Sequence, residues 1–162
     1  MEVDIRKYQD EDIPRMLEIW NQVIENANAF PQMEKMSEGE AKILFDSQTY
    51  TAVAIGNNQV MGLYILHPNN IGRCGHIGNG SYAVDANARG YHIGEKLVRH
   101  SMKMASTYGF SLLQFNAVVR TNVGAIHLYE KIGFHRVGVI PGGYLLGDGN
   151  YESIIVYYIK LQ

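Results

Sequence analysis

Alternating apolar and polar positions predict strands along this chain, and apolar positions spaced by three or four residues predict helices. On this basis the expected helices run from about Ile13 to Ile24 and over Glu38–Asp46, Tyr91–Tyr108 and Val123–Ile132. The expected strands are Val3–Lys7, Tyr50–Ile55, Gln59–His67, His76–Val84, Ser111–Asn116, Phe134–Ile140 and Glu152–Lys160.

Local signals set several of these boundaries. Ser37 followed by Glu40 has the pattern of a capping box, which begins a helix. The turn residues Asn57 and Asn58 tolerate positive φ and therefore predict a tight hairpin between the second and third strands. The glycine- and tyrosine-rich stretch Pro141–Tyr151 is expected to be a loop between the last two strands, either closing over a bound substrate or serving a dimer contact.

The resulting order is β-α-α-β-β-β-α-β-α-β-β, in which hairpins flank one central β-α-β unit. Hairpins make antiparallel pairs and the β-α-β unit makes a parallel pair. We therefore expect an α/β (α+β) fold with one mixed, largely antiparallel sheet and helices on both faces. The length of 162 residues suits a single domain over residues 1–162.

Charge and cysteine usage exclude several classes of function. Lys and Arg total 14 against 16 Asp and Glu, so the chain lacks the basic surplus typical of nucleic-acid binding. Cys74 is the only cysteine, which rules out an intrachain disulfide, and no metal site is expected. No apolar run approaches the roughly 20 residues that span a bilayer, so no membrane role is expected and a cytoplasmic location is the simplest interpretation.

The turn after the fourth strand is the first candidate site. Its residues Arg89-Gly90-Tyr91-His92-Ile93-Gly94 lead from a strand into a helix. The first N–H groups of a helix have no internal partner, and the helix dipole adds positive charge there, so such a turn suits a diphosphate. A plain chain reversal is the competing interpretation. A dinucleotide-binding turn would instead follow the first strand with a different glycine spacing.

A second block follows the next strand, with Asn122, Ala125, Tyr129, Lys131, Gly133 and Phe134 at fixed spacing. With these two blocks in this order, the chain resembles the GNAT superfamily of CoA-dependent N-acyltransferases along nearly its whole length. In that family the turn reads R/Q-x-x-G-x-G/A and the second block N-x-x-A-x-x-x-Y-x-K-x-G-F. His92 departs from the pattern because it stands where the family most often has its first glycine. Its Cβ is expected to crowd a diphosphate unless the side chain points to solvent.

The resemblance implies acetyl-CoA as co-substrate and an N-acetyltransferase activity. It implies that Arg89, Gly90, Tyr91, His92, Ile93 and Gly94 bind the diphosphate. Backbone groups of Tyr82 and Val84 would pair with the pantetheine arm or hold the oxyanion, and Asn122 would contact the arm. Tyr129 would lie beside the thioester sulfur, where its hydroxyl donates to the leaving thiolate. A core tyrosine is the competing interpretation for Tyr129.

The acceptor is expected to be a small-molecule amine, amino-acid-like or polyamine-like. Asn79 lies mid-strand, where asparagine is disfavoured, and Asn116 ends the next strand. If the two strands splay apart, as in similar enzymes, both amides face the acceptor; otherwise they cap a strand end or a bulge. His76 and Glu130 are the nearest candidate bases in sequence, and either is more often an ordinary surface residue. A peptide or protein acetyltransferase, a CoA-binding regulator without turnover, and a homodimer remain open.

Overall fold

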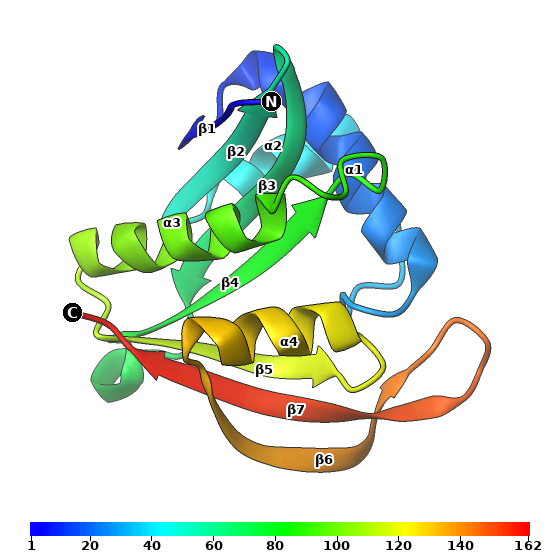
Figure 1. Ribbon diagram of the computed structural model, residues 1–162, viewed down its shortest axis with the longest axis vertical. Coiled ribbons are helices and arrows are strands. Elements are labelled where there is room, and N and C mark those ends of the chain that lie inside the picture. Colours follow the sequence, from blue (N-terminus) through cyan, green and yellow to red (C-terminus); the bar gives the residue numbers. More distant parts are fainter.

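The computed structural model describes residues 1–162 as one seven-stranded sheet with two helices on each face (Figure 1). The helices are α1 (Ile13–Asn26), α2 (Glu38–Asp46), α3 (Ile93–Thr107) and α4 (Val123–Ile132). The strands are β1 (Val3–Lys7), β2 (Tyr50–Gly56), β3 (Gln59–Pro68), β4 (Ile77–Val84), β5 (Leu112–Val119), β6 (His135–Leu145) and β7 (Tyr151–Lys160). This order of elements confirms the predicted fold class. None of the four helices combines the length and apolar character that a bilayer crossing requires.

The strands follow the order β1-β2-β3-β4-β5-β7-β6, and every neighbouring pair is antiparallel except β4 with β5. That parallel pair is short, because it joins only Ile77 with Leu112 and Gly78 with Leu113. Beyond these residues the two strands diverge, as Figure 1 shows for β4 and β5 to the right of the C-terminus. The splay that similar enzymes suggested is therefore present.

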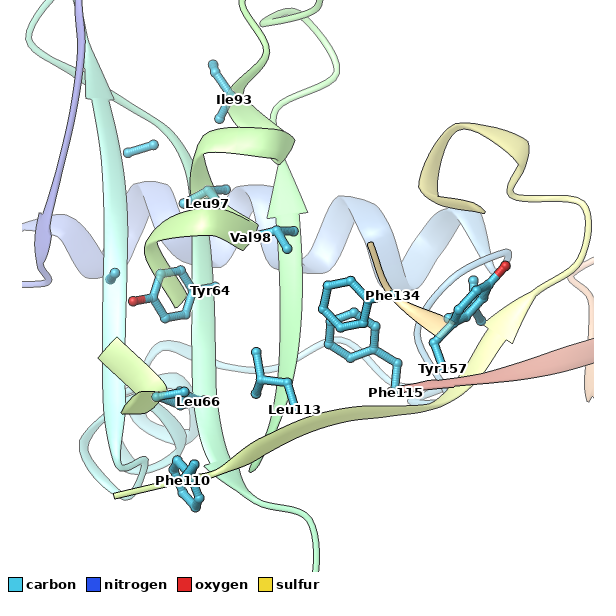
Figure 2. Close-up of a cluster of buried hydrophobic side chains, with 14 of the residues drawn as sticks. Tyr64, Leu66, Ile93, Leu97, Val98, Phe110, Leu113, Phe115, Phe134 and Tyr157 are labelled. Atoms are coloured by element: carbon cyan, nitrogen blue, oxygen red, sulfur yellow. The ribbon is translucent and has the colours of Figure 1, made fainter. Parts of the chain in front are cut away.

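Two cores hold the helices against the sheet, one on each face. The strand period of two sends Leu63 and Ile65 of β3 toward α1 and α2, and Tyr64 and Leu66 toward α3. The core on the α3 side extends to β5 and to the start of β6, where the rings of Phe115 and Phe134 stack with centroids 4.7 Å apart (Figure 2). Each face of the sheet is thus covered by apolar contacts.

The predicted caps and turns have the expected geometry. The Ser37 side chain accepts a hydrogen bond from the Glu40 N–H, and the Glu40 carboxylate accepts one from the Ser37 N–H. Asn57 and Asn58 both adopt positive φ, at 50° and 61°, as a two-residue hairpin turn of this type requires. These short-range features follow from the residues themselves.

Three boundaries differ from the prediction for an identifiable structural reason, and others differ by one or two residues. β6 continues through Pro141 to Leu145, so most of the expected 141–151 loop is strand; a register shift between Ile140 and Tyr144 accommodates the proline and the glycines as a bulge. β5 continues to Val119, because a second shift lets it keep pairing with β7. Helix α3 begins two residues later than expected, because His92 has a left-handed backbone.

Candidate active site

A cavity of about 320 Å³ occupies the gap between the diverging strands β4 and β5. Its walls come from both strands, from α3 and α4, and from the segment after α1. The lining residues are Ala29–Pro31, Asn79–Tyr82, Gly94, Val98, Phe115–Val119, Asn122, Ala125, Leu128 and Tyr129. The cavity thus gathers segments that are far apart in the sequence, and it contains several of the predicted site residues.

One edge of β4 faces this gap with unpaired backbone groups. The Ile77 carbonyl and the Asp85 N–H, at the two ends of β4, bond to residues on the β3 side. Because successive strand residues direct their backbone groups to opposite edges, those of Tyr82 and Val84 point toward the gap. No strand pairs with them there, so their N–H and C=O groups have no partner in the sheet.

The Tyr82 side chain has a different role from its backbone. Its hydroxyl lies 2.6 Å from Ser101 Oγ on α3 and donates to it, because the Ser101 hydroxyl itself donates to the Val98 carbonyl. Burial raises the pKa of Tyr82 far above its ordinary value, so this hydroxyl stays protonated. The ring lies over Gly80, whose missing Cβ would otherwise stand 2.8 Å from the tyrosine oxygen. The side chain of Tyr82 therefore helps hold β4 against α3.

The turn between β4 and α3 is unusually rich in free donors. Seven successive backbone N–H groups, from Arg89 to Glu95, donate no hydrogen bond to any group of the protein. The Arg89 side chain is exposed and forms no ion pair, and Gly90 has a φ of +88° that other residues adopt only with strain. Ile93 buries its side chain in the core and can contribute only its backbone. Free amides, a helix N-terminus and an unpaired cation together suit an anionic ligand.

The backbone conformation of His92 explains why glycine is preferred at this position. It is the N-cap of α3 with a φ of +57° and a ψ of +33°, a left-handed conformation that carries a steric cost of roughly 1–2 kcal/mol for residues with a Cβ. Its side chain is exposed and forms no capping hydrogen bond, so the imidazole does not stabilise this conformation. At Gly94 an added Cβ would meet Leu128 only at 3.6 Å, an ordinary contact, which fits the family's tolerance of alanine there.

Tyr129 lies on α4 with its ring against Phe115 and Phe134, at centroid distances of 4.7 and 5.6 Å. It lines the cavity, and its hydroxyl makes no hydrogen bond to the protein. Burial raises the pKa of Tyr129 far above its ordinary value. The hydroxyl is therefore a neutral donor at every physiological pH, with no competing partner.

Asn122 begins α4 and lines the same cavity. Its Oδ1 accepts a hydrogen bond from the Ala125 N–H at 3.3 Å, which leaves the side-chain NH₂ group free. The residue thus combines a helix cap with an unused donor at the cavity wall.

The structure brings Asn79 and Asn116 together through a third amide. Both side-chain nitrogens donate to Oδ1 of Asn69, at 3.0 Å and 2.7 Å respectively. Sequence reasoning missed Asn69 because it placed the residue in a loop after the third strand. No local pattern marks it, since its partners are 10 and 47 positions away along the chain.

The cavity lining contains no acidic, basic or histidine residue. His76 is exposed just before β4, outside the lining. Glu130 also lies outside it, where its carboxylate accepts hydrogen bonds from the hydroxyl of Tyr157 and the guanidinium of Arg136. Neither candidate base is at the site. No group of three or more His, Cys, Asp or Glu residues is placed to hold a metal ion.

The segment after α1 closes the cavity on the α1–α2 side, and the β6–β7 hairpin holds that segment in place. The Tyr144 hydroxyl donates to the Phe30 carbonyl at 2.6 Å in a buried bond, and the Gly147 N–H donates to the Ala27 carbonyl at 3.2 Å. The ring of Phe30 packs on Trp20 with centroids 4.5 Å apart. The closing role suggested for the 141–151 segment is therefore indirect, through Ala29–Pro31.

Comparisons with known proteins agree with this arrangement. The model of the acetyltransferase (GNAT) family matches residues 13–134. The N-acetyltransferase aca1 of Schizosaccharomyces pombe is 29% identical over 169 residues, covering 93% of this chain and 81% of that protein. A GCN5-related N-acetyltransferase from Kribbella flavida is 27% identical, with a TM-score of 0.90 over 98% of both chains. The phosphinothricin acetyltransferase of Sinorhizobium meliloti, solved with AcCoA, has a TM-score of 0.91 over 99% of this chain and 89% of that one; at 19% identity it shows the fold alone.

The family match covers most of the chain, so this protein belongs to the acetyltransferase (GNAT) family. It is an acetyl-CoA-dependent N-acetyltransferase, as the two sequence blocks predicted.

His92→Gly is expected to stabilise the protein by about 0.5–1 kcal/mol. The substitution relieves the left-handed strain, and part of the gain is lost to the greater freedom of glycine in the unfolded chain. Urea unfolding followed by circular dichroism measures the change. The matched control is His127→Gly on exposed helix α4, where glycine is expected to destabilise by a few tenths of a kcal/mol. A loss of stability in both variants would contradict the strain at His92.

Proposed function

We propose that this acetyltransferase binds the diphosphate of acetyl-CoA on the free amides from Arg89 to Glu95, and acetylates a small-molecule amine in the cavity between β4 and β5. The observation that carries the proposal is the run of seven unpaired N–H groups at the start of α3, next to that cavity. A dianionic group there would gain several charge-assisted hydrogen bonds at once. Arg89 would add its charge, and Tyr91, His92, Ile93 and Gly94 would contribute backbone donors.

The pantetheine arm would then run along the unpaired edge of β4. The backbone groups of Tyr82 and Val84 would pair with its amides as a neighbouring strand would. From the opposite wall, the free NH₂ group of Asn122 would donate to the arm. This path leads toward the Asn79 end of the cavity, where β4 and β5 come together.

The reaction joins the acceptor nitrogen to the acetyl carbon and breaks the carbon–sulfur bond, and the proton that the nitrogen loses passes to solvent. A backbone N–H at Tyr82 or Val84 would donate to the carbonyl oxygen as it gains negative charge. The Tyr129 hydroxyl would donate to the sulfur as it leaves. Because burial raises the pKa of Tyr129, full transfer of its proton is unfavourable before the thiolate forms, and its main contribution is the hydrogen bond.

The acceptor would occupy the end of the cavity near Asn79 and Asn116. This end is neutral and lined by amides, and the Ala29–Pro31 segment closes it, which favours a small amino-acid-like or polyamine-like amine over a folded protein. With no acidic, basic or histidine side chain in the lining, the amine must shed its proton to solvent before attack. An α-amine with a pKa near 8 does so far more easily than a lysine-like amine near 10.4.

A homodimer is the proposed assembly. β6 is an edge strand, and it exposes Val137, Val139 and Ile140 on the outside of the sheet. Exposed apolar edge strands commonly pair with a second copy. Sedimentation velocity is expected to show a dimer that Val139→Lys dissociates; a monomer at every protein concentration would contradict this assembly.

The cytoplasmic location stays a prediction from the sequence.

A thiol-release assay with acetyl-CoA tests the acceptor class. We expect turnover with one or more L-amino acids or polyamines in a panel that also contains peptides and lysine-rich protein. The rate should rise with pH up to the pKa of the acceptor amine. Tyr129→Phe should lower kcat by about 100-fold, whereas Tyr158→Phe, on exposed β7, should leave it unchanged. Turnover with peptides alone would favour the peptide acetyltransferase. Binding of CoA without turnover on any acceptor would favour the regulator.

The diphosphate site is tested with two substitutions of nearly identical shape. Gly90→Asn and Gly90→Asp carry similar backbone strain at φ +88°, and an added Cβ there meets no atom within 4 Å. Only aspartate adds a negative charge beside the proposed diphosphate. Isothermal titration is expected to show Gly90→Asp binding CoA at least tenfold more weakly than Gly90→Asn. Equal dissociation constants would place the diphosphate elsewhere.

A further inference from the structure

Three asparagine side chains meet beside the cavity, two from neighbouring strands and one from the residue that follows a third strand. Asn69 directly follows β3, Asn79 lies on β4 and Asn116 on β5. Oδ1 of Asn69 accepts from both of the others, with N···O distances of 3.0 Å to Asn79 and 2.7 Å to Asn116. Two donors use both lone pairs of one carbonyl oxygen, so Asn69 is saturated as an acceptor.

This contact determines which atom each amide offers to the cavity. The Asn79 side-chain nitrogen is turned toward Asn69, so its carbonyl oxygen lies on the opposite side of the planar amide. That oxygen accepts no hydrogen bond from the protein, and Asn79 lines the cavity. In Asn116 the oxygen is already engaged by Nε2 of Gln114 at 2.9 Å, and one N–H remains free. Asn79 thus presents an acceptor and Asn116 a donor.

Asn69 sits where the pairing of β4 with β5 ends. Asn79 follows Gly78, the last residue of β4 that pairs with β5. The Asn69 backbone N–H donates to the Ile77 carbonyl at 2.8 Å, so its main chain is held independently of its side chain. The side chain bridges the two strands at the point where their main chains separate.

We propose that Asn69 is a positioning residue for the acceptor site. By accepting hydrogen bonds from both amides, Asn69 holds the Asn79 side-chain oxygen toward the cavity. There the oxygen accepts a hydrogen bond from the attacking amine, and this bond directs the nitrogen lone pair of the amine toward the thioester. Without such a partner, the side-chain amide of an asparagine rotates easily by 180°, because its oxygen and its NH₂ group are nearly the same size. The proposal rests on the acceptor site of the proposed function, and it adds a residue that does not itself touch the acceptor.

The kinetic test compares Asn69→Ala with Asn70→Ala, a matched control whose side chain bonds only to the neighbouring Ile71 N–H. The probe is acetyl-CoA with whichever of the twenty L-amino acids, spermidine and L-alaninamide releases thiol fastest. Asn69→Ala is expected to raise the KM of that amine about tenfold, as for the loss of one ordered hydrogen bond, and to change the KM of acetyl-CoA less than twofold. Asn70→Ala should change neither.

A double-mutant cycle separates positioning from a general structural role. If Asn69 acts through Asn79, the Asn69→Ala/Asn79→Ala variant should be no worse than Asn79→Ala alone. If the effects of the two substitutions on the KM of the amine multiply instead, the proposal is wrong. An unchanged amine KM in Asn79→Ala would overturn both the proposal and the acceptor site. An effect of Asn79→Ala without one of Asn69→Ala would overturn the positioning role only.

A second measurement needs no acceptor. In ¹⁵N NMR of the free protein, the Asn79 side-chain hydrogen that is bound to Asn69 should exchange slowly with solvent. Asn69→Ala should speed this exchange at least tenfold, and Asn69→Asp, which keeps an accepting oxygen at the same place, should restore slow exchange. Fast exchange in the unmodified protein, or no rescue by aspartate, would overturn the proposal.

Discussion

The separation of β4 from β5 after two paired residues creates both the cavity and the unpaired edge of β4. A sheet normally gains a hydrogen bond for each further residue, so strands that part leave backbone groups without partners. Aromatic packing keeps them apart here. Phe115 of β5 contacts Tyr82 edge-on and Tyr129 at close range, with centroids 5.7 and 4.7 Å away. These rings occupy the α3 and α4 side of the gap, and closing it would require displacing them.

The start of α3 is held in place from both faces of the sheet. Arg15 of α1 forms an ion pair with Asp85, the first residue after β4, and Asp85 also accepts a hydrogen bond from the Asn87 N–H. On the other face, Ile93 anchors the first turn of the helix in the core. These two anchors fix the conformation of the turn between them. The backbone N–H groups of the turn are not needed for this, so seven of them remain without a partner.

The end of the cavity near Asn79 is neutral, in contrast to the turn that carries Arg89. The polar side chains of the cavity are amides, the Ser81 hydroxyl and two tyrosine hydroxyls whose pKa burial raises, so none of them changes charge near neutral pH. Under the proposed function, selectivity among amines would come from their own proton affinity and from the orientation of hydrogen bonds. The Tyr144–Phe30 bond, which holds one wall of the cavity, would then limit the size of the acceptor.

Features that depend only on neighbours along the chain could be predicted from the sequence. The capping box at Ser37, the turn at Asn57 and the spacing that identifies the family are all short-range patterns, and the elements they predicted are present. Tertiary structure decided what depends on distant partners. β6 became longer than expected because β7 pairs with it across a bulge, and the Asn69 contacts join the residue after β3 to β4 and β5. Local propensity contains no information on such contacts, because a side-chain amide finds its partner only after the strands that carry both have been brought together.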